Sequence, residues 1–126
     1  MTTYYNINPQ FYVSVDCIIF GFDKGSLKLL LLKRNFEPAK GSWSLMGGFV
    51  QDGESVDDAA KRVLAELTGL ENVYMEQVGT FGEVDRDPGE RVISVAYYAL
   101  ININEYDREL VQQHNAYWVN INNLPD

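Results

Sequence analysis

The stretch that decides the fold runs from residue 48 to residue 70 and reads GFVQDGESVDDAAKRVLAELTGL. Its second part predicts an amphipathic helix over residues 55–67. Ser55 is a suitable N-cap, and the two aspartates after it lie in the first turn, where the helix dipole favours negative charge. Gly69 is placed to end the helix as a C-cap glycine. Apolar residues recur at the helical spacing i, i+3, i+4, i+7, i+8 and i+11, namely Val56, Ala59, Ala60, Val63, Leu64 and Leu67.

Strands are predicted on both sides of this helix. Residues 11–22 alternate apolar and polar side chains, residues 27–33 are an aliphatic run typical of a buried central strand, and residues 43–50 are extended. The remaining predictions are a polar arm at 1–10, a turn at 23–26, a loop at 36–42, strands at 73–82, 91–103 and 117–121, an acidic loop at 83–90, and a short helical turn within 104–116. This order of elements indicates an α/β fold.

Composition limits the classes of function. The chain has 126 residues, of which 46% are hydrophobic, so we expect one globular domain with one core. Its net charge of −8 disfavours contact with a phosphate backbone. No apolar run approaches the roughly 18 residues that span a bilayer, and no signal peptide is recognisable. Cys17 is the only cysteine and His114 the only histidine, which favours a reducing cytoplasm and excludes a multi-histidine metal site.

Residues 48–70 resemble the Nudix box, G-x5-E-x7-R-E-U-x-E-E-x-G-U, in which U is a bulky aliphatic residue. The positions that match are Gly48, Glu54, Arg62, Leu64, Glu66, Gly69 and Leu70. Val63 and Leu67 stand where the pattern has glutamate. The resemblance implies an α/β/α sandwich around a mixed β-sheet. Because a Nudix domain usually enters its last helix after a Leu-Pro pair such as Leu124-Pro125, we expect that final helix to be missing from this fragment.

The resemblance also implies a chemistry. A Nudix enzyme cuts a nucleoside diphosphate linked to another group, with magnesium held by the glutamates of the box against the diphosphate. Positions 63, 66 and 67 share one helical face, and only Glu66 remains acidic there. We therefore expect no catalytic residue, no metal site and no cofactor, and we interpret Glu54 and Arg62 as a structural ion pair. The degenerate box then consists of Gly48, Glu54, Arg62, Val63, Glu66 and Leu67.

Three further stretches, residues 29–34, 41–50 and 86–95, look like the ADP-ribose-pyrophosphatase-like branch, although Met46 departs from its usual proline. Within that branch the degenerate box resembles the Nudix-related transcriptional regulators, which join a Nudix-like effector domain to a C-terminal winged helix-turn-helix. One group of these regulators senses ADP-ribose-type metabolites. An AraR-like group senses L-arabinose, and the box and its flanks are most similar to that group.

The resemblance predicts that residues 1–126 form an effector-binding and dimerisation domain of a cytoplasmic regulator of sugar utilisation. The predicted partners are a small-molecule effector, most simply a pentose, and a second copy in a homodimer. DNA would be contacted only through a C-terminal domain outside this chain, and no membrane is involved. Two alternatives stay open. One is a sensor of an ADP-ribose-type nucleotide. The other is a magnesium-dependent hydrolase of ADP-ribose or a related compound, with substitute carboxylates such as Glu83, Asp85 or Glu90.

An effector of this kind needs polar partners for its hydroxyl groups and an aromatic face for its C–H side. The predicted ligand-binding residues are Arg34, Phe36, Glu37, Lys40, Trp43, Gly47, Gly48, Phe49, Glu66 and Arg91. Simpler roles compete with this assignment, because Trp43 and Phe49 could be core aromatics, Lys40 could be solvated, and the arginines could pair with surface acids.

Overall fold

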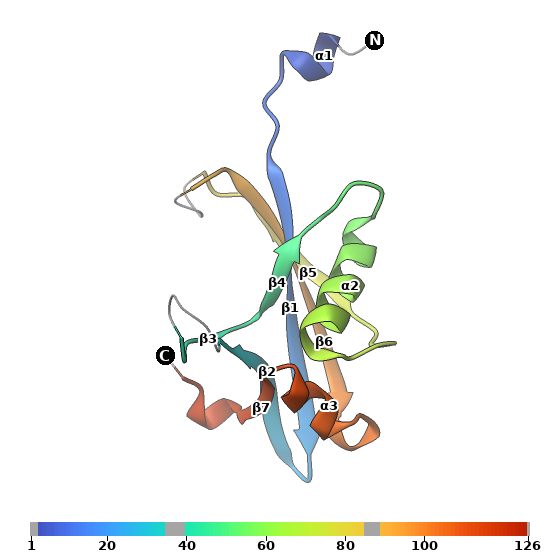
Figure 1. Cartoon of the computed structure of the whole chain (residues 1–126), viewed down its shortest axis with the longest axis vertical. Coiled ribbons are helices and arrows are strands. Elements are labelled where there is room, and N and C mark those ends of the chain that lie inside the picture. Colours follow the sequence, from blue (N-terminus) through green and yellow to red (C-terminus); the bar gives the residue numbers. More distant parts are fainter. Residues whose placement is uncertain (1–2, 35–39, 85–88, 126) are drawn as a thin grey trace.

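The computed structural model describes residues 3–34, 40–84 and 89–125. A mixed β-sheet of seven strands forms the body of the molecule (Figure 1). The segment before the sheet extends away from this body and carries α1 (Thr3–Asn6), a short helix within the predicted polar arm. No helix in the described ranges is long and apolar enough to cross a membrane.

The central strand is β1 (Tyr12–Asp23), which confirms the strand predicted from alternation at residues 11–22. One edge of β1 pairs in parallel with β6 (Val92–Asn102) over nearly its whole length. The other edge has two antiparallel partners in succession, first β4 (Met46–Phe49) and then β2 (Ser26–Lys33). The hairpin partner β2 and two strands more distant in the sequence, β4 and β6, therefore meet at β1.

A tight hairpin joins β1 to β2. Its two central residues, Lys24 and Gly25, have φ angles of 48° and 84°. Positive φ at both positions is the signature of a type I′ turn, whose twist matches that of the flanking strands. In β2 the predicted central strand is confirmed, because Leu30 and Leu31 are buried and β2 has neighbours on both edges.

The outer strands differ from their predictions mainly at the ends. β5 (Glu76–Phe81) pairs with β6 and begins three residues later than the start of the predicted strand at 73–82, because Val73 packs into the core from the connection that precedes β5. β3 (Trp43–Ser44) and β7 (Ala116–Asn120) pair with β2. β6 ends at Asn102, one residue earlier than predicted, since the Asn102 side chain accepts a hydrogen bond from the Asn104 backbone N–H and starts a 3-10 turn, Ile103–Glu105.

The helix at the centre of the prediction is α2 (Val56–Thr68). Ser55 Oγ accepts a hydrogen bond from the Asp58 backbone N–H at 3.1 Å, as an N-cap should. Gly69 has φ 81° and donates its N–H to the Ala65 carbonyl at 2.8 Å, which ends the helix. The predicted turn within 104–116 is α3 (Arg108–Gln113), and a further 3-10 turn, Ile121–Asn123, follows β7.

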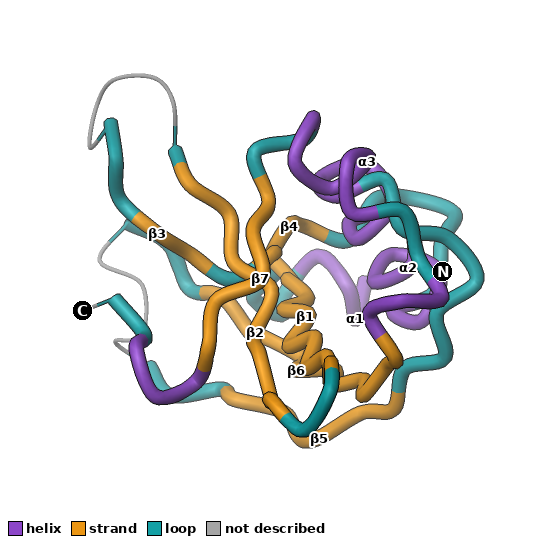
Figure 2. The backbone as a smooth tube through the Cα atoms, turned by 90° about the horizontal axis from the view of Figure 1, so that it is seen from below, coloured by secondary structure: helices purple, strands orange, loops and turns teal. Residues whose placement is uncertain are grey.

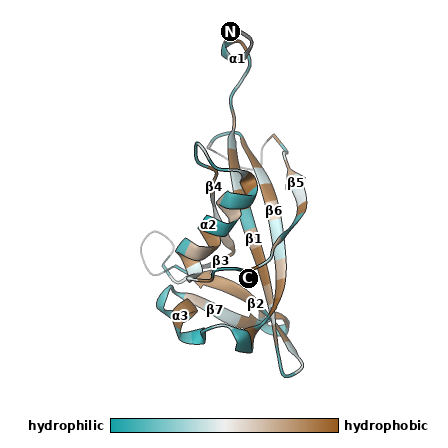
Figure 3. Cartoon of the chain, turned by 90° about the vertical axis from the view of Figure 1, so that its right-hand side faces the viewer, coloured by the Kyte–Doolittle hydropathy of each residue, from teal (hydrophilic) through white to brown (hydrophobic). Residues whose placement is uncertain are grey.

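Both α2 and α3 cover the same face of the sheet (Figure 2). The core lies between them and the strands, and hydrophobic segments run along the strands beneath α2 (Figure 3). Its fully buried members include Ile19, Leu30, Met46 and Leu64. The opposite face exposes Phe22, Tyr98 and Leu100, and none of the helices in the described residues covers it. The α/β class and the mixed sheet agree with the prediction, and the layer that would complete an α/β/α sandwich is not among the described residues.

Candidate functional site

Arg62 on α2 is the centre of the box. Its Nε and Nη2 donate to the two oxygens of Glu54 at 3.0 and 2.9 Å, the paired geometry typical of a strong arginine–carboxylate contact. Nη2 also donates to the Phe49 carbonyl at 2.8 Å, and Nη1 donates to Glu66 at 3.0 Å. One side chain thus joins β4, the loop after it and the helix, and the ion pair expected between Glu54 and Arg62 is present.

This ion pair is partly shielded from water, with 31% of the Arg62 side chain and 16% of the Glu54 side chain exposed. The hydrogen bonds from Arg62, and secondarily the one from the Gln51 backbone N–H, hold the pKa of Glu54 below its ordinary value of 4.5. The pKa of Arg62 is raised in turn, chiefly by Glu54. Both groups therefore remain charged at neutral pH.

The residues of the box do not fit a magnesium site. Val63 is 2% exposed and packs in the core, and a Cβ atom added to Gly48 would lie 2.8 Å from Val63 Cγ2. The side chain at position 63 therefore lies against the Gly48 backbone, where the Nudix pattern would bring a carboxylate. Leu67 packs against the same core, which leaves Glu66, with 61% of its side chain exposed and bonded to Arg62. In the described ranges no three His, Cys, Asp or Glu residues are grouped so that they could hold a metal ion.

The glycines before the box lie on β4, opposite β1. Gly47 faces Asp16, and a Cβ atom added there would lie 2.6 Å from Asp16 Oδ1. Gly48 faces Val15. Phe49 is half exposed and contacts Tyr12 edge-on, with 5.7 Å between the ring centroids. Three of the predicted ligand-binding residues are thus consecutive on one strand and adjoin the box.

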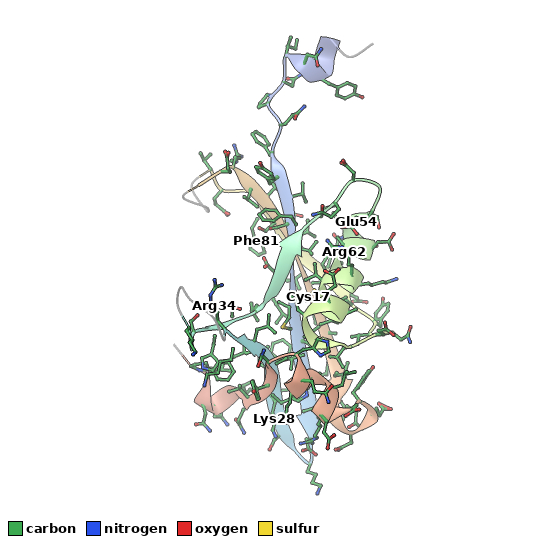
Figure 4. All side chains as sticks on the ribbon, in the orientation of Figure 1. Cys17, Lys28, Arg34, Glu54, Arg62 and Phe81 are labelled. Atoms are coloured by element: carbon green, nitrogen blue, oxygen red, sulfur yellow. The ribbon has the colours of Figure 1, made fainter. Side chains whose placement is uncertain are left out.

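The other predicted ligand-binding residues are placed elsewhere. Trp43 packs edge-on against Tyr117 at 5.9 Å, with Lys33 Nζ 5.4 Å from its ring centroid. Arg34 donates its backbone N–H to the Ser42 carbonyl at 2.8 Å and lies on the far side of the strands from Glu54 and Arg62 (Figure 4). Lys40 is exposed. Phe36 and Glu37 fall outside the described residues.

Arg91 lies just before β6. Its Nη2 donates to the Gly82 carbonyl at 3.1 Å, and its guanidinium carbon is 4.7 Å from the Phe11 ring centroid. Its Nε is buried and has no hydrogen-bond partner among the residues that the structure describes. Trp43 thus contacts residues of β2 and β7, whereas Arg91 contacts residues just after β5 and just before β1. A ligand contact by either residue remains a prediction.

Two features near the box are absent from the site predicted from the sequence. The first is a groove of about 820 Å³ beside α2, lined by Lys61, Arg62, Tyr74 and Met75 among others. At its edge the Tyr97 hydroxyl donates to Asp57, and burial together with that bond raises the pKa of Tyr97 to about 12. The second is Asp16, which lies beside Gly47 in the middle of the sheet. The sequence does contain a signal for Asp16, because Asp16 is a charged residue inside a largely apolar strand.

Comparison with known proteins agrees with this geometry. The model of the NUDIX domain matches residues 10–126, and the chain belongs to that family. It is 36% identical over 115 residues to the ADPR responsive transcriptional repressor NtrR of Acinetobacter baylyi, covering 90% of this chain and 46% of the relative. It is 42% identical over 85 residues to an ADP-ribose pyrophosphatase of Methanocaldococcus jannaschii, covering 68% of this chain and 48% of that enzyme.

Among solved structures, the NUDIX domain of Shewanella oneidensis NrtR complexed with ADP ribose superposes with a TM-score of 0.72 at 30% identity, covering 94% of this chain and 77% of that one. The likeness to a Nudix-related transcriptional regulator is therefore established, whereas arabinose-type specificity is not. The chain spans about half the length of the two curated relatives, 46% and 48%.

Proposed function

We propose that this chain is the ligand-sensing domain of a transcriptional regulator and that its box no longer supports hydrolysis. The observation that carries the proposal is Val63, which fills with a buried isopropyl group the position beside Gly48 where a metal-binding carboxylate belongs. A box that keeps its structural ion pair and loses its metal-binding face retains the fold of the old substrate site while losing the metal that activates water. The likeness to a transcriptional repressor supports the same assignment.

The ligand in this proposal carries a pentose ring. Two candidate ligands contain a pentose ring. Free L-arabinose follows from the form of the box, and ADP-ribose is the compound to which the A. baylyi relative responds. The effector would act by binding one arrangement of the regulator better than another, which shifts the population of the state that binds DNA. A homodimer in the cytoplasm, and DNA contact through a winged helix outside these residues, belong to the proposal as well.

A titration of the domain with candidate ligands tests the proposed function. The domain is mixed with L-arabinose, other pentoses and ADP-ribose, each with and without magnesium, and the unfolding temperature and heat of binding are measured. A ligand at about 100-fold excess over its Kd adds ~2.7 kcal/mol to the free energy of unfolding. We expect magnesium-independent stabilisation by one of these compounds. Absence of stabilisation by all of them would refute the proposal.

A second candidate, magnesium-dependent hydrolysis of ADP-ribose, is favoured by the likeness to the M. jannaschii pyrophosphatase. It requires carboxylates from outside the box. Incubation with ADP-ribose and magnesium, followed by chromatography of the nucleotides, distinguishes the two candidates. Appearance of AMP would support the enzyme, whereas intact ADP-ribose that nevertheless stabilises the domain supports the sensor.

A further inference from the structure

The face of the sheet opposite α2 contains a patch of short and polar side chains, of which Ser94 and Ala96 are buried and Ser14, Asp16 and Gly79 are half-buried. The registers of four neighbouring strands place two rows side by side across β4, β1, β6 and β5: Phe49–Ser14–Ser94–Phe81 and Gly47–Asp16–Ala96–Gly79. The Oγ atoms of Ser14 and Ser94 are 2.6 Å apart, so these two side chains lie on one face, and residues two positions further along each strand lie on the same face. We call the six residues of these rows other than the two phenylalanines the polar floor: Ser14, Asp16, Gly47, Gly79, Ser94 and Ala96.

Two residues of the polar floor are glycines and have no side chain. Gly47 has no side chain where a Cβ atom would lie 2.6 Å from Asp16 Oδ1, so the carboxylate lies over the backbone of β4. Nothing lies within 4 Å of the position that a Cβ atom of Gly79 would take. Glycine inside a strand weakens it and often marks a place where another group approaches the backbone closely. Two such glycines, one at each end of the row that contains Asp16, are consistent with a surface built to receive a ligand.

Aromatic side chains stand at both ends of the adjacent row. Phe49 is 49% exposed and Phe81 is 42% exposed, whereas Ser94 between them is 4% exposed. With strands about 4.8 Å apart, the backbones of the two phenylalanines are separated by about 14 Å, a span comparable to the length of one or two rings. Apolar walls around a few convergent polar groups are the usual make-up of a small-molecule site.

The hydrogen-bond donors and acceptors of the polar floor determine which part of a ligand can bind there. An ionised Asp16 accepts hydrogen bonds and donates none, while the serine hydroxyls both donate and accept. Hydroxyl groups on a ring match that set, and a bond to a charged acceptor is stronger than one between neutral groups. A phosphate placed beside Asp16 would be repelled. The floor therefore suits an uncharged, hydroxyl-bearing ring.

We infer that Asp16 determines the specificity of this domain by binding hydroxyl groups of the effector's pentose ring, with Phe49 or Phe81 against the C–H face of that ring. The inference rests on the proposed function, since it names the residue that recognises the effector. The ring can come from a free pentose such as L-arabinose or from the terminal ribose of ADP-ribose.

Calorimetric titration of two variants tests the inference. Asp16→Asn removes the charge at nearly constant shape, and Gly47→Ala places a methyl group 2.6 Å from Asp16 Oδ1, which must then move. Glu76→Gln is the matched control, because Glu76 lies on the same face, paired with Tyr98 outside the floor. Each variant is titrated with L-arabinose, with ADP-ribose, and with ADP, which lacks the terminal ribose, after its thermal unfolding has shown that it is folded.

For the ligand that wild type binds, we expect the Kd of Asp16→Asn and of Gly47→Ala to rise about tenfold or more, with Glu76→Gln unchanged. A Kd within about twofold of wild type in both variants overturns the role of Asp16 and leaves the proposed function intact. An equal loss for ADP and ADP-ribose overturns the assignment to the terminal ribose. A wild-type domain that binds none of the compounds overturns the proposed function itself, and this inference with it.

Discussion

At the scale of the residue, the proposed loss of hydrolysis rests on position 63. A glutamate there would lie against the Gly48 backbone and could turn its carboxylate towards a metal beside the carbonyl. Valine instead contributes a buried branched side chain to the core, at 2% exposure. The same substitution therefore removes a ligand and adds apolar packing, which a single change can accomplish because one helical position faces both the core and the strand glycine.

Restoring the two missing carboxylates tests this account. In the Val63→Glu, Leu67→Glu double variant, we expect the free energy of unfolding in metal-free buffer to fall by about 3 kcal/mol, because a charge is placed in an apolar environment. Added magnesium should recover a substantial part of that loss, since the metal offsets the buried charge. Thermal unfolding with and without magnesium measures both effects.

The matched control is Val63→Gln with Leu67→Gln, which has the same shape without charge and should be destabilised regardless of magnesium. A wild-type domain whose unfolding temperature already rises strongly with magnesium would contradict the account, because the existing residues would then hold the metal.

Cys17 provides a second test at this scale. Its thiol is fully buried and contacts the Ala60 carbonyl, with Sγ 3.6 Å from the oxygen. Burial, and secondarily the charge of Asp16, raises the pKa of Cys17 to about 12. Because the thiolate is the reactive form, we expect a disulfide reagent at pH 8.5 to leave the native domain unmodified and to modify one thiol in urea. Rapid reaction of the folded protein would show that this core opens readily.

At the scale of the element, the loop and helix of the box behave as one unit because Arg62 joins them. It bonds Glu54 in the loop, the Phe49 carbonyl on β4 and Glu66 on α2 itself. The ordinary helix signals, Ser55 at the start and Gly69 at the end, determine where α2 lies along the chain. The arginine then determines how the preceding loop is held against it.

The unit formed by the loop of the box and α2 should become less stable at acidic pH. The pKa of Glu54 is lowered in the folded state from 4.5, chiefly by Arg62, so its contribution to stability is complete above about pH 4.5 and is lost as the pH falls through the lower folded value. We expect Glu54→Gln to be less stable than wild type at pH 6 and the difference to shrink towards pH 3. Urea unfolding across that range measures it.

Asp52→Asn, which alters an exposed carboxylate in the same loop, serves as the control and should parallel wild type. A constant difference between Glu54→Gln and wild type from pH 6 to pH 3 would mean that the ion pair contributes nothing that depends on the charge of Glu54. The hydrogen bonds to Asp23 and Asp57, whose pKa values are also lowered, account for the acid sensitivity that should remain in the variant.

At the scale of the whole molecule, the sequence predicts what depends on neighbouring residues and misses what depends on strand pairing. The range and caps of α2, the β1 strand and the ion pair of the box follow from local spacing. The pairing of Ser14 with Ser94, eighty residues apart, does not. Asp16 is absent from the predicted site for the same reason, since only the register of β4 against β1 brings it to Gly47. Conversely, Trp43 and Arg91 have the chemistry expected of a ligand site, but Trp43 lies on β3 and Arg91 lies just before β6, both outside the loop and helix of the box.

The net charge is a property of the whole domain, and the last prediction concerns its effect on DNA binding. Ten basic and eighteen acidic side chains give the domain a formal charge of −8. A protein that binds DNA without sequence preference does so by neutralising phosphates, with a Kd of roughly 10⁻⁴–10⁻⁶ M that tightens as salt is lowered. We therefore expect these 126 residues alone to leave the fluorescence anisotropy of a labelled duplex unchanged at about 50 mM salt, both with and without the effector. Saturable binding that weakens on raising the salt would place a DNA-contacting surface on this domain and would contradict the division of labour in which DNA is bound by a separate winged helix.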